Sequence, residues 1–173
     1  MRKNYFSKTF KALLAIVSCC AFMNVWAIEI HVQKAGTLPT LLPTCSESTL
    51  KVTGTINGTD VKHLRQLIGA GVTSLDLAEV KIVSGGVAYD GTNKTENDVI
   101  GTAMFKECTK LRSIELPTSI SAIHSNAFAR SGLTKVDIPN SVSRLGGDAF
   151  AYCNSLNTVV IGRRVSRMHQ GVF

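Results

Sequence analysis

The sequence has little charge, few aromatic side chains and little proline. Its 173 residues are 18% charged and 6% aromatic, with four prolines and one tryptophan, against 45% hydrophobic residues. This composition excludes intrinsic disorder, which goes with low hydrophobicity, and it excludes a charge-rich coiled coil. Because aromatic residues are scarce, we expect a regular core of Leu, Ile and Val. The length allows one domain of about 100–200 residues, or one domain with an appendage.

Cysteine is too sparse for a disulfide framework or a thiolate metal site. Of five cysteines, two lie in the N-terminal apolar segment, which leaves Cys45, Cys108 and Cys153. Three is an odd number and no C-x-x-C pair occurs, so a complete set of disulfides, a zinc site and thioredoxin-type chemistry all lack support. We expect no metal or other cofactor.

Residues 1–27 have the pattern of a secretory signal peptide. The basic segment ends at Lys11, an apolar stretch covers residues 12–23, and Val25-Trp26-Ala27 precedes a cleavage site at Ile28. The stretch is shorter than the roughly 20 apolar residues of a membrane span. The four residues that end at Cys19 resemble a lipoprotein box, which would attach the chain to a membrane by a lipid, but apolar residues continue beyond it. We therefore expect export to the cell surface or the medium.

The net charge of +7 mostly reflects this N-terminal segment. Four basic residues precede the apolar stretch, and without them 15 basic residues face 12 acidic ones, a net charge of +3. A basic patch for nucleic acid is therefore not supported, and we expect no nucleic-acid partner.

An internal repeat is the main signal. Residues 104–126, 127–148 and 149–171 align, and Val172 begins a fourth copy. The phenylalanines are 23, 22 and 23 residues apart. Six apolar columns stay in phase: Phe105, Phe128, Phe150 and Phe173; Leu111, Leu133 and Leu156; Ile114, Val136 and Val159; Leu116, Ile138 and Ile161; Ile120, Val142 and Val165; Ile123, Leu145 and Met168.

A period of this length predicts a solenoid in which each coil supplies one short strand to a parallel sheet. The expected strands cover residues 113–116, 135–138 and 158–161, and their alternation sends every second side chain inward. Pro117 and Pro139 end the first two strands. The fold class is thus mainly β, with short parallel strands and irregular, turn-rich returns, and each coil gains its stability from its neighbours.

The repeat pattern A-F-x-x-C-x-x-L-x-x-I-x-L-P-x-S-V-x-x-I-G, with local departures, resembles the BspA-type bacterial leucine-rich repeat. The resemblance covers residues 100–173 strongly and residues 72–82 weakly, as a degenerate first coil. The family's Gly after the last apolar column is matched by Gly146 but replaced by His124 and His169. The resemblance implies a cell-surface protein for adhesion or protein–protein interaction, with host extracellular-matrix proteins as one class of partner.

Upstream of the repeats, residues 28–71 predict a small strand-plus-helix cap. Residues 50–53 alternate like a strand, and a helix with Thr59 as N-cap ends at Gly69 and Gly71. Its apolar face would cover the open end of the first coil: Val61, Leu64, Leu67 and Ile68. Residues 72–173 form the repeat region, interrupted by a polar loop over residues 85–101 that we expect to be exposed.

Catalytic signals are weak. His124 and His169 occupy the same repeat position, so repetition explains them better than an active site does. The segment that starts at Asp90 resembles a calcium loop, but Thr92 and Lys94 stand where an EF-hand needs acidic or amide ligands. We expect no enzymatic activity.

The outward strand positions are the remaining candidate site, and a protein partner is the expected ligand. They form two columns: Ser113, Lys135 and Thr158; Glu115, Asp137 and Val160. An alternative function is the non-catalytic targeting portion of a longer secreted carbohydrate-active or proteolytic enzyme. We also expect native sequence beyond Phe173, because the last coil carries apolar residues without a polar cap, and we expect residues 28–173 alone to self-associate or fray.

Overall fold

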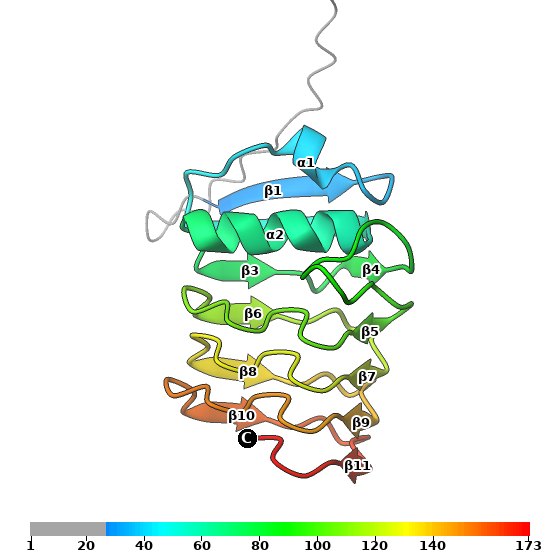
Figure 1. The fold of residues 1–173 in the computed structure, drawn as a ribbon, viewed down its shortest axis with the longest axis vertical. Coiled ribbons are helices and arrows are strands. Elements are labelled where there is room, and N and C mark those ends of the chain that lie inside the picture. Colours follow the sequence, from blue (N-terminus) through cyan, green and yellow to red (C-terminus); the bar gives the residue numbers. More distant parts are fainter. Residues whose placement is uncertain (1–26) are drawn as a thin grey trace, which may run out of the picture.

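The computed structural model describes residues 27–173, so the predicted signal peptide, with Cys19, lies outside the described residues except for Ala27. Helices and strands are stacked in chain order along one axis, from α1 near one end to β11 at the other (Figure 1). All pairs between the named strands are parallel. A repeat fold with parallel strands is therefore confirmed. Within residues 27–173, no helix has the length and apolar character needed to cross a bilayer.

The strands run along two sides of the stack. On the first side, the order β1-β2-β3-β6 is followed by the pair β8-β10; on the second side, β4, which pairs with β2, precedes the sheet of order β5-β7-β9-β11 (Figure 1). The bounds are β1 Ala27–Val32, α1 Leu38–Leu41, β2 Thr49–Ile56, α2 Gly58–Ala70, β3 Ser74–Asp76, β4 Val80–Ile82, β5 Val99–Ile100, β6 Ser113–Glu115, β7 Ala122–Ile123, β8 Lys135–Asp137, β9 Arg144–Leu145, β10 Thr158–Val160 and β11 Arg167–Met168.

Helix α2 begins two residues earlier than the sequence predicted. Its N-cap is Asn57, whose Oδ1 accepts a hydrogen bond from the Thr59 backbone N–H at 2.9 Å, while Asp60 Oδ2 accepts from the Asn57 N–H at 2.9 Å. This reciprocal capping box satisfies two N–H groups that a helix start leaves free, which is why Thr59 is not the cap. At the other end, Gly69 lies inside the helix and Gly71 alone ends it.

Asp60 also connects the helix to the chain before it. Its carboxylate is fully buried and accepts hydrogen bonds from the backbone N–H groups of Gly36 and Leu38, the latter at 2.9 Å. A buried carboxylate needs such donors to offset its desolvation. Asp60 therefore holds α1 against the start of α2.

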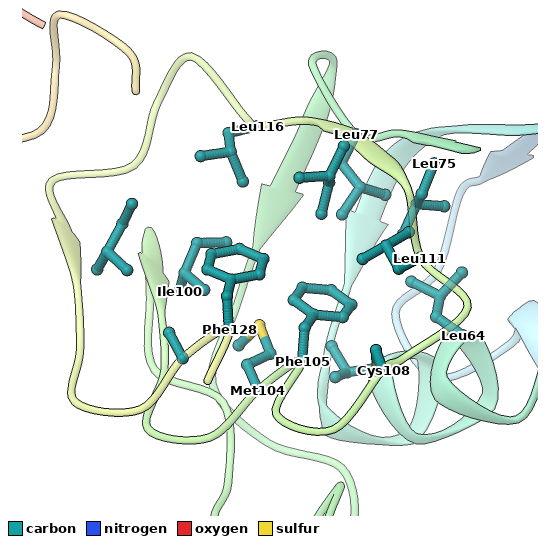
Figure 2. Packing of buried hydrophobic residues seen from close by; sticks show 14 of the residues in the cluster. Leu64, Leu75, Leu77, Ile100, Met104, Phe105, Cys108, Leu111, Leu116 and Phe128 are labelled. Atoms are coloured by element: carbon teal, nitrogen blue, oxygen red, sulfur yellow. The ribbon is translucent and has the colours of Figure 1, made fainter. Parts of the chain in front are cut away.

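The apolar face of α2 packs against the first repeat. Leu64 lies beside Leu75, Cys108 and Leu111 (Figure 2). Arg65 donates from Nη1 to the carbonyl oxygen of Met104 at 2.9 Å, and Lys110 donates from Nζ to that of Gly69 at 2.7 Å. Apolar packing and polar contacts thus join α2 to residues 104–111.

The predicted inward columns are buried in the first two repeats. Ile114 is 4% exposed and Val136 is 1% exposed, and Leu116 and Ile138 are equally well covered. In the third repeat, Val159 is half-buried and Ile161 is exposed. Each strand is one residue shorter than predicted, because the residue before Pro117, before Pro139 or before Gly162 lies outside the ladder.

Each repeat supplies two strands, so the prediction of one strand per coil is wrong. The second strands pair in register, with Ile100 opposite Ile123, Ile123 opposite Leu145, and Leu145 opposite Met168. A strand of two residues is too short to show an alternating pattern in sequence, so only the apolar column was visible.

The loop at residues 85–101 is partly buried, which corrects the expectation of an exposed loop. Its last residues, Val99 and Ile100, form β5. Tyr89 is 3% exposed, and its hydroxyl donates to the carbonyl oxygen of Thr102 at 2.7 Å; Thr95 is equally buried, and its hydroxyl donates to Gly85 O at 3.1 Å. Polar residues with such internal partners do not need solvent, so composition alone misplaces them.

The phenylalanine column forms a stack of nearly parallel rings. Ring centroids are 5.5 Å apart between Phe105 and Phe128, 5.1 Å between Phe128 and Phe150, and 5.6 Å between Phe150 and Phe173. Figure 2 shows the first two rings side by side in the core. The first three rings thus fill the interior opposite the first side of the stack, as predicted, whereas Phe173 is 54% exposed.

The two cysteines at the same repeat position, Cys108 and Cys153, are unbonded. Among the described residues, Cys45, Cys108 and Cys153 are free. Cys153 donates from Sγ to the Phe128 carbonyl oxygen at 3.1 Å, and burial raises the pKa of Cys108 to about 11. Both thiols of the repeats therefore act as small buried side chains.

Candidate partner-binding face

The residues predicted to bind a partner lie together on the outward face of β6, β8 and β10. Strand register places Thr158 beside Lys135 and Val160 beside Asp137, and β8 follows β6 one repeat later. All six predicted side chains are exposed or half-buried: Ser113, Glu115, Lys135, Asp137, Thr158 and Val160. Their role in binding stays a prediction.

The face extends further toward the N-terminus than the sequence predicted. Strand β3 pairs with β6 so that Ser74 lies opposite Ser113 and Asp76 opposite Glu115. The Ser113 hydroxyl donates to Ser74 Oγ at 2.8 Å. The signal was present, because Ser74-Leu75-Asp76-Leu77 repeats the order hydroxyl, apolar, acidic, apolar found at residues 113–116. We call the outward side chains of β3, β6, β8 and β10 the acidic face.

Three carboxylates form one column across this face. Asp76 and Glu115 are register partners on β3 and β6, and Asp137 occupies the equivalent repeat position on β8, which belongs to the next two-stranded sheet. Neighbouring strands lie about 4.8 Å apart, and like charges directly opposite one another across a sheet are destabilising. The column therefore carries a local repulsion that packing does not require.

Basic side chains neutralise the column only in part. Lys135 Nζ lies 2.9 Å from Asp137 Oδ2, and this hydrogen bond raises the pKa of Lys135 above its ordinary value. Within residues 27–173, no basic side chain lies within salt-bridge distance of Glu115, and Asp137 Oδ1 is a buried atom without a hydrogen-bond partner. One ammonium thus serves a column of three carboxylates.

A further ion-pair group lies next to the acidic face. Lys51, which β2 places beside Asp76, has its Nζ 2.9 Å from Glu79 Oε1 and 3.4 Å from Glu29 Oε1. The hydrogen bond to Glu79 is the main reason why the pKa of Lys51 is raised. Lys51 therefore belongs to its own acidic pair and leaves Asp76 unpaired; Asp76 instead accepts from the Ala78 backbone N–H at 2.9 Å.

In the part of the chain that the structure describes, no group of three or more His, Cys, Asp or Glu side chains is placed to hold a metal ion. The calcium-like segment is a closed turn, because Asp90 Oδ1 accepts from the backbone N–H groups of Thr92 and Asn93 at 3.0 and 2.7 Å. Its carboxylate thus serves its own loop.

The two histidines lie on the other side of the molecule from this face. His124 and His169 follow β7 and β11 and line a small hollow with Arg144. Arg144 Nη2 lies 3.2 Å from His124 Nε2, and His124 Nδ1 lies 3.7 Å from Glu96 Oε1. Both positions come from the repeat, as the sequence predicted.

Comparison with known proteins identifies the repeat. Residues 92–173 match the family model of the BspA type leucine rich repeat region, in six copies. A search of curated proteins found no match. The chain is similar to a leucine-rich repeat protein of Bacteroides ovatus whose crystal structure is known, at 20% identity and a TM-score of 0.42. That alignment covers 91% of this chain and 39% of the other, so this chain spans about two-fifths of that protein's length.

Proposed function

We propose that this chain, a BspA-type leucine-rich-repeat protein over residues 92–173, is exported and binds protein partners at the cell surface through the acidic face. Proteins of this repeat family are typically non-catalytic and bind other proteins, and we infer the same here. Export rests on the pattern of residues 1–27. Adhesion to host extracellular-matrix proteins is the role that the family resemblance favours.

In this proposal the domain organisation follows the stack. Residues 28–71 cap the N-terminal end of a solenoid, and residues 72–173 form its coils. The contacts of Arg65 and Lys110 across the boundary support this arrangement. Such a cap is needed because a solenoid coil without a neighbour exposes apolar surface.

The carboxylate column Asp76, Glu115 and Asp137 is the observation that carries the proposal. Side chains that repel one another at strand spacing reduce the stability of the sheet, so a role outside folding explains them better. A partner with Lys or Arg side chains at a similar spacing would remove the repulsion and supply charge-assisted hydrogen bonds. The expected partner segment is therefore basic.

Binding to immobilised extracellular-matrix proteins tests the proposal. We expect Glu115→Lys to weaken binding by about tenfold or more, because it places a cation where the partner presents one. Glu107→Lys is the matched control: Glu107 is equally charged and exposed but lies on a return turn, near Arg130. Equal losses in both variants, or none in Glu115→Lys, would contradict the proposal.

A further inference from the structure

The second sheet carries an open hollow on its outward face. Two neighbouring columns line it across three coils: Ser121, Ser143 and Ser166; Ala122, Arg144 and Arg167. Its volume is about 430 Å³, within the range of about 300–1,000 Å³ that is typical of ligand pockets. Figure 1 shows β7, β9 and β11 stacked on one side of the molecule; these strands begin with Ala122, Arg144 and Arg167, and each serine directly precedes its strand.

Two arginines make the hollow basic. Arg144 and Arg167 are register partners on β9 and β11, so their side chains start one strand spacing apart, about 4.8 Å. The contact with His124 holds the Arg144 guanidinium at the edge of the hollow. Within the described residues, neither arginine has a carboxylate within salt-bridge distance. Neither guanidinium group is therefore neutralised by a carboxylate, and Arg144 keeps the N–H groups that its contact with His124 does not use.

Two acidic side chains beside this sheet are already engaged. Glu96 lies against His124 at 3.7 Å, and Asp98 Oδ1 accepts from the Ser119 hydroxyl at 3.4 Å. Arg163 and Arg164 lie in the turn that leads into β11 and are exposed. This side of the last two coils therefore has the opposite charge from the acidic face.

The serines supply hydrogen-bond acceptors. Each hydroxyl donates to a carbonyl oxygen one repeat earlier: Ser121 to Asp98 at 3.3 Å, Ser143 to Ser121 at 3.2 Å, and Ser166 to Ser143 at 3.3 Å. A hydroxyl has one donor and two acceptor lone pairs. With the donor used, each Ser Oγ offers the hollow only lone pairs, which suit a ligand that brings its own hydroxyl donors.

We infer that this serine–arginine hollow binds an acidic polysaccharide. The ligand's carboxylates would pair with Arg144 and Arg167, because a guanidinium matches the planar geometry of a carboxylate. Its sugar hydroxyls would donate to the serine Oγ atoms. A ligand with both groups in a repeating chain matches a site whose two columns repeat along the coils.

Two other classes of macromolecule fit the hollow less well. Single-stranded nucleic acid binds through aromatic stacking platforms, and no residue that lines the hollow is aromatic. An extended peptide adds along the backbone of an open sheet edge, here β11, whereas the hollow lies across side chains of three successive coils. The hollow presents guanidinium groups for the carboxylates of a sugar acid and serine Oγ atoms for its hydroxyls. It is separate from the acidic face.

Binding of the full chain to polygalacturonate, with neutral dextran as the reference polymer, tests this inference. We expect Arg144→Gln/Arg167→Gln to lower the affinity by about 10- to 100-fold, since each lost charged hydrogen bond is worth about tenfold. The control Lys34→Gln/Lys62→Gln removes the same charge from exposed positions in and near α2, and we expect a change of less than about twofold. Circular dichroism checks that all variants fold.

Three results would overturn the inference. One is the absence of polygalacturonate binding by the native chain. Another is an equal loss in both double variants, which would show diffuse attraction in place of a site. The third is binding of oligothymidylate or polyglutamate as tightly as polygalacturonate at the same salt concentration, which would show that charge alone is recognised.

Discussion

The second and third repeats have the same sequence pattern but different burial. Ile138 is 3% exposed in the second repeat, whereas Ile161, its counterpart in the third, is 43% exposed. Leu145 is 0% exposed in the second repeat, whereas Met168 in the third is 57% exposed. The backbone geometry is equivalent, because β8 and β10 pair in register. The difference teaches that a repeat becomes buried through the next repeat along the stack.

The largest expected effect comes from the phenylalanine column. We expect Phe128→Ala to lower the free energy of unfolding by about 3–5 kcal/mol, because the ring fills the interior between Phe105 and Phe150. Phe173→Ala should cost only about 1 kcal/mol, because this ring stacks on Phe150 alone and is half-exposed. Denaturant unfolding of both variants measures the difference. Equal losses of stability in the two variants would contradict the claim that a ring stacked between two others contributes more than a ring stacked on one.

A smaller effect on the free energy of unfolding is expected from the ionisation of the Cys108 thiol at alkaline pH. Because burial raises its pKa to about 11 in the folded chain, the folded chain keeps a proton that the unfolded chain releases above about pH 8.5. Its contribution to stability is complete below that pH and is lost as the pH rises toward 11, by roughly 1.4 kcal/mol per unit. Cys108→Ala should therefore remove this part of the loss of stability at alkaline pH.

The control for this prediction is Cys153→Ala, at the same position in the third repeat. We expect Cys153→Ala to retain the alkaline dependence that Cys108→Ala removes, in unfolding measurements at about pH 8.5 and about pH 10.5. If both variants lose stability with pH exactly as the native chain does, the Cys108 thiol is not the group that titrates.

The smallest effect is expected on the acidic face. Lys135→Ala should change the free energy of unfolding by no more than about 0.5 kcal/mol, because the Lys135–Asp137 pair is exposed on both sides. Denaturant unfolding beside Phe128→Ala provides the comparison. A loss as large as that of Phe128→Ala would mean that the inward and outward faces are misassigned.

Periodicity made most of the repeat region predictable. The columns of Ile114 and Phe105 recur through the sequence, so both the strands of the first side and the ring stack followed from them. The second sheet was missed because its strands have two residues, too few to show the alternation that indicates a strand. The start of α2 was misplaced because Thr59 and Asn57 are both good caps, and only the position of the Asp60 carboxylate decides between them.

The two candidate sites also differ in how far the sequence predicts them. The acidic face follows from alternation along single strands, so its six central residues could be named from sequence. The serine–arginine hollow depends on the small side chain of Ala122 lying beside Arg144 of the next coil. The second sheet brings these residues together, and because the sequence did not predict this sheet, it gave no reason to group them.

Hydrogen exchange at one repeated backbone bond tests most directly whether neighbouring repeats stabilise one another. The N–H groups of Phe105, Phe128 and Phe150 each donate at 2.7 Å to the corresponding return turn of the next repeat, at Ala127, Ala149 and Val172. We expect the Phe105 and Phe128 amides to exchange at least about tenfold more slowly than the Phe150 amide, whose acceptor lies in the least covered segment. Equal protection of all three amides would contradict this dependence on the next repeat.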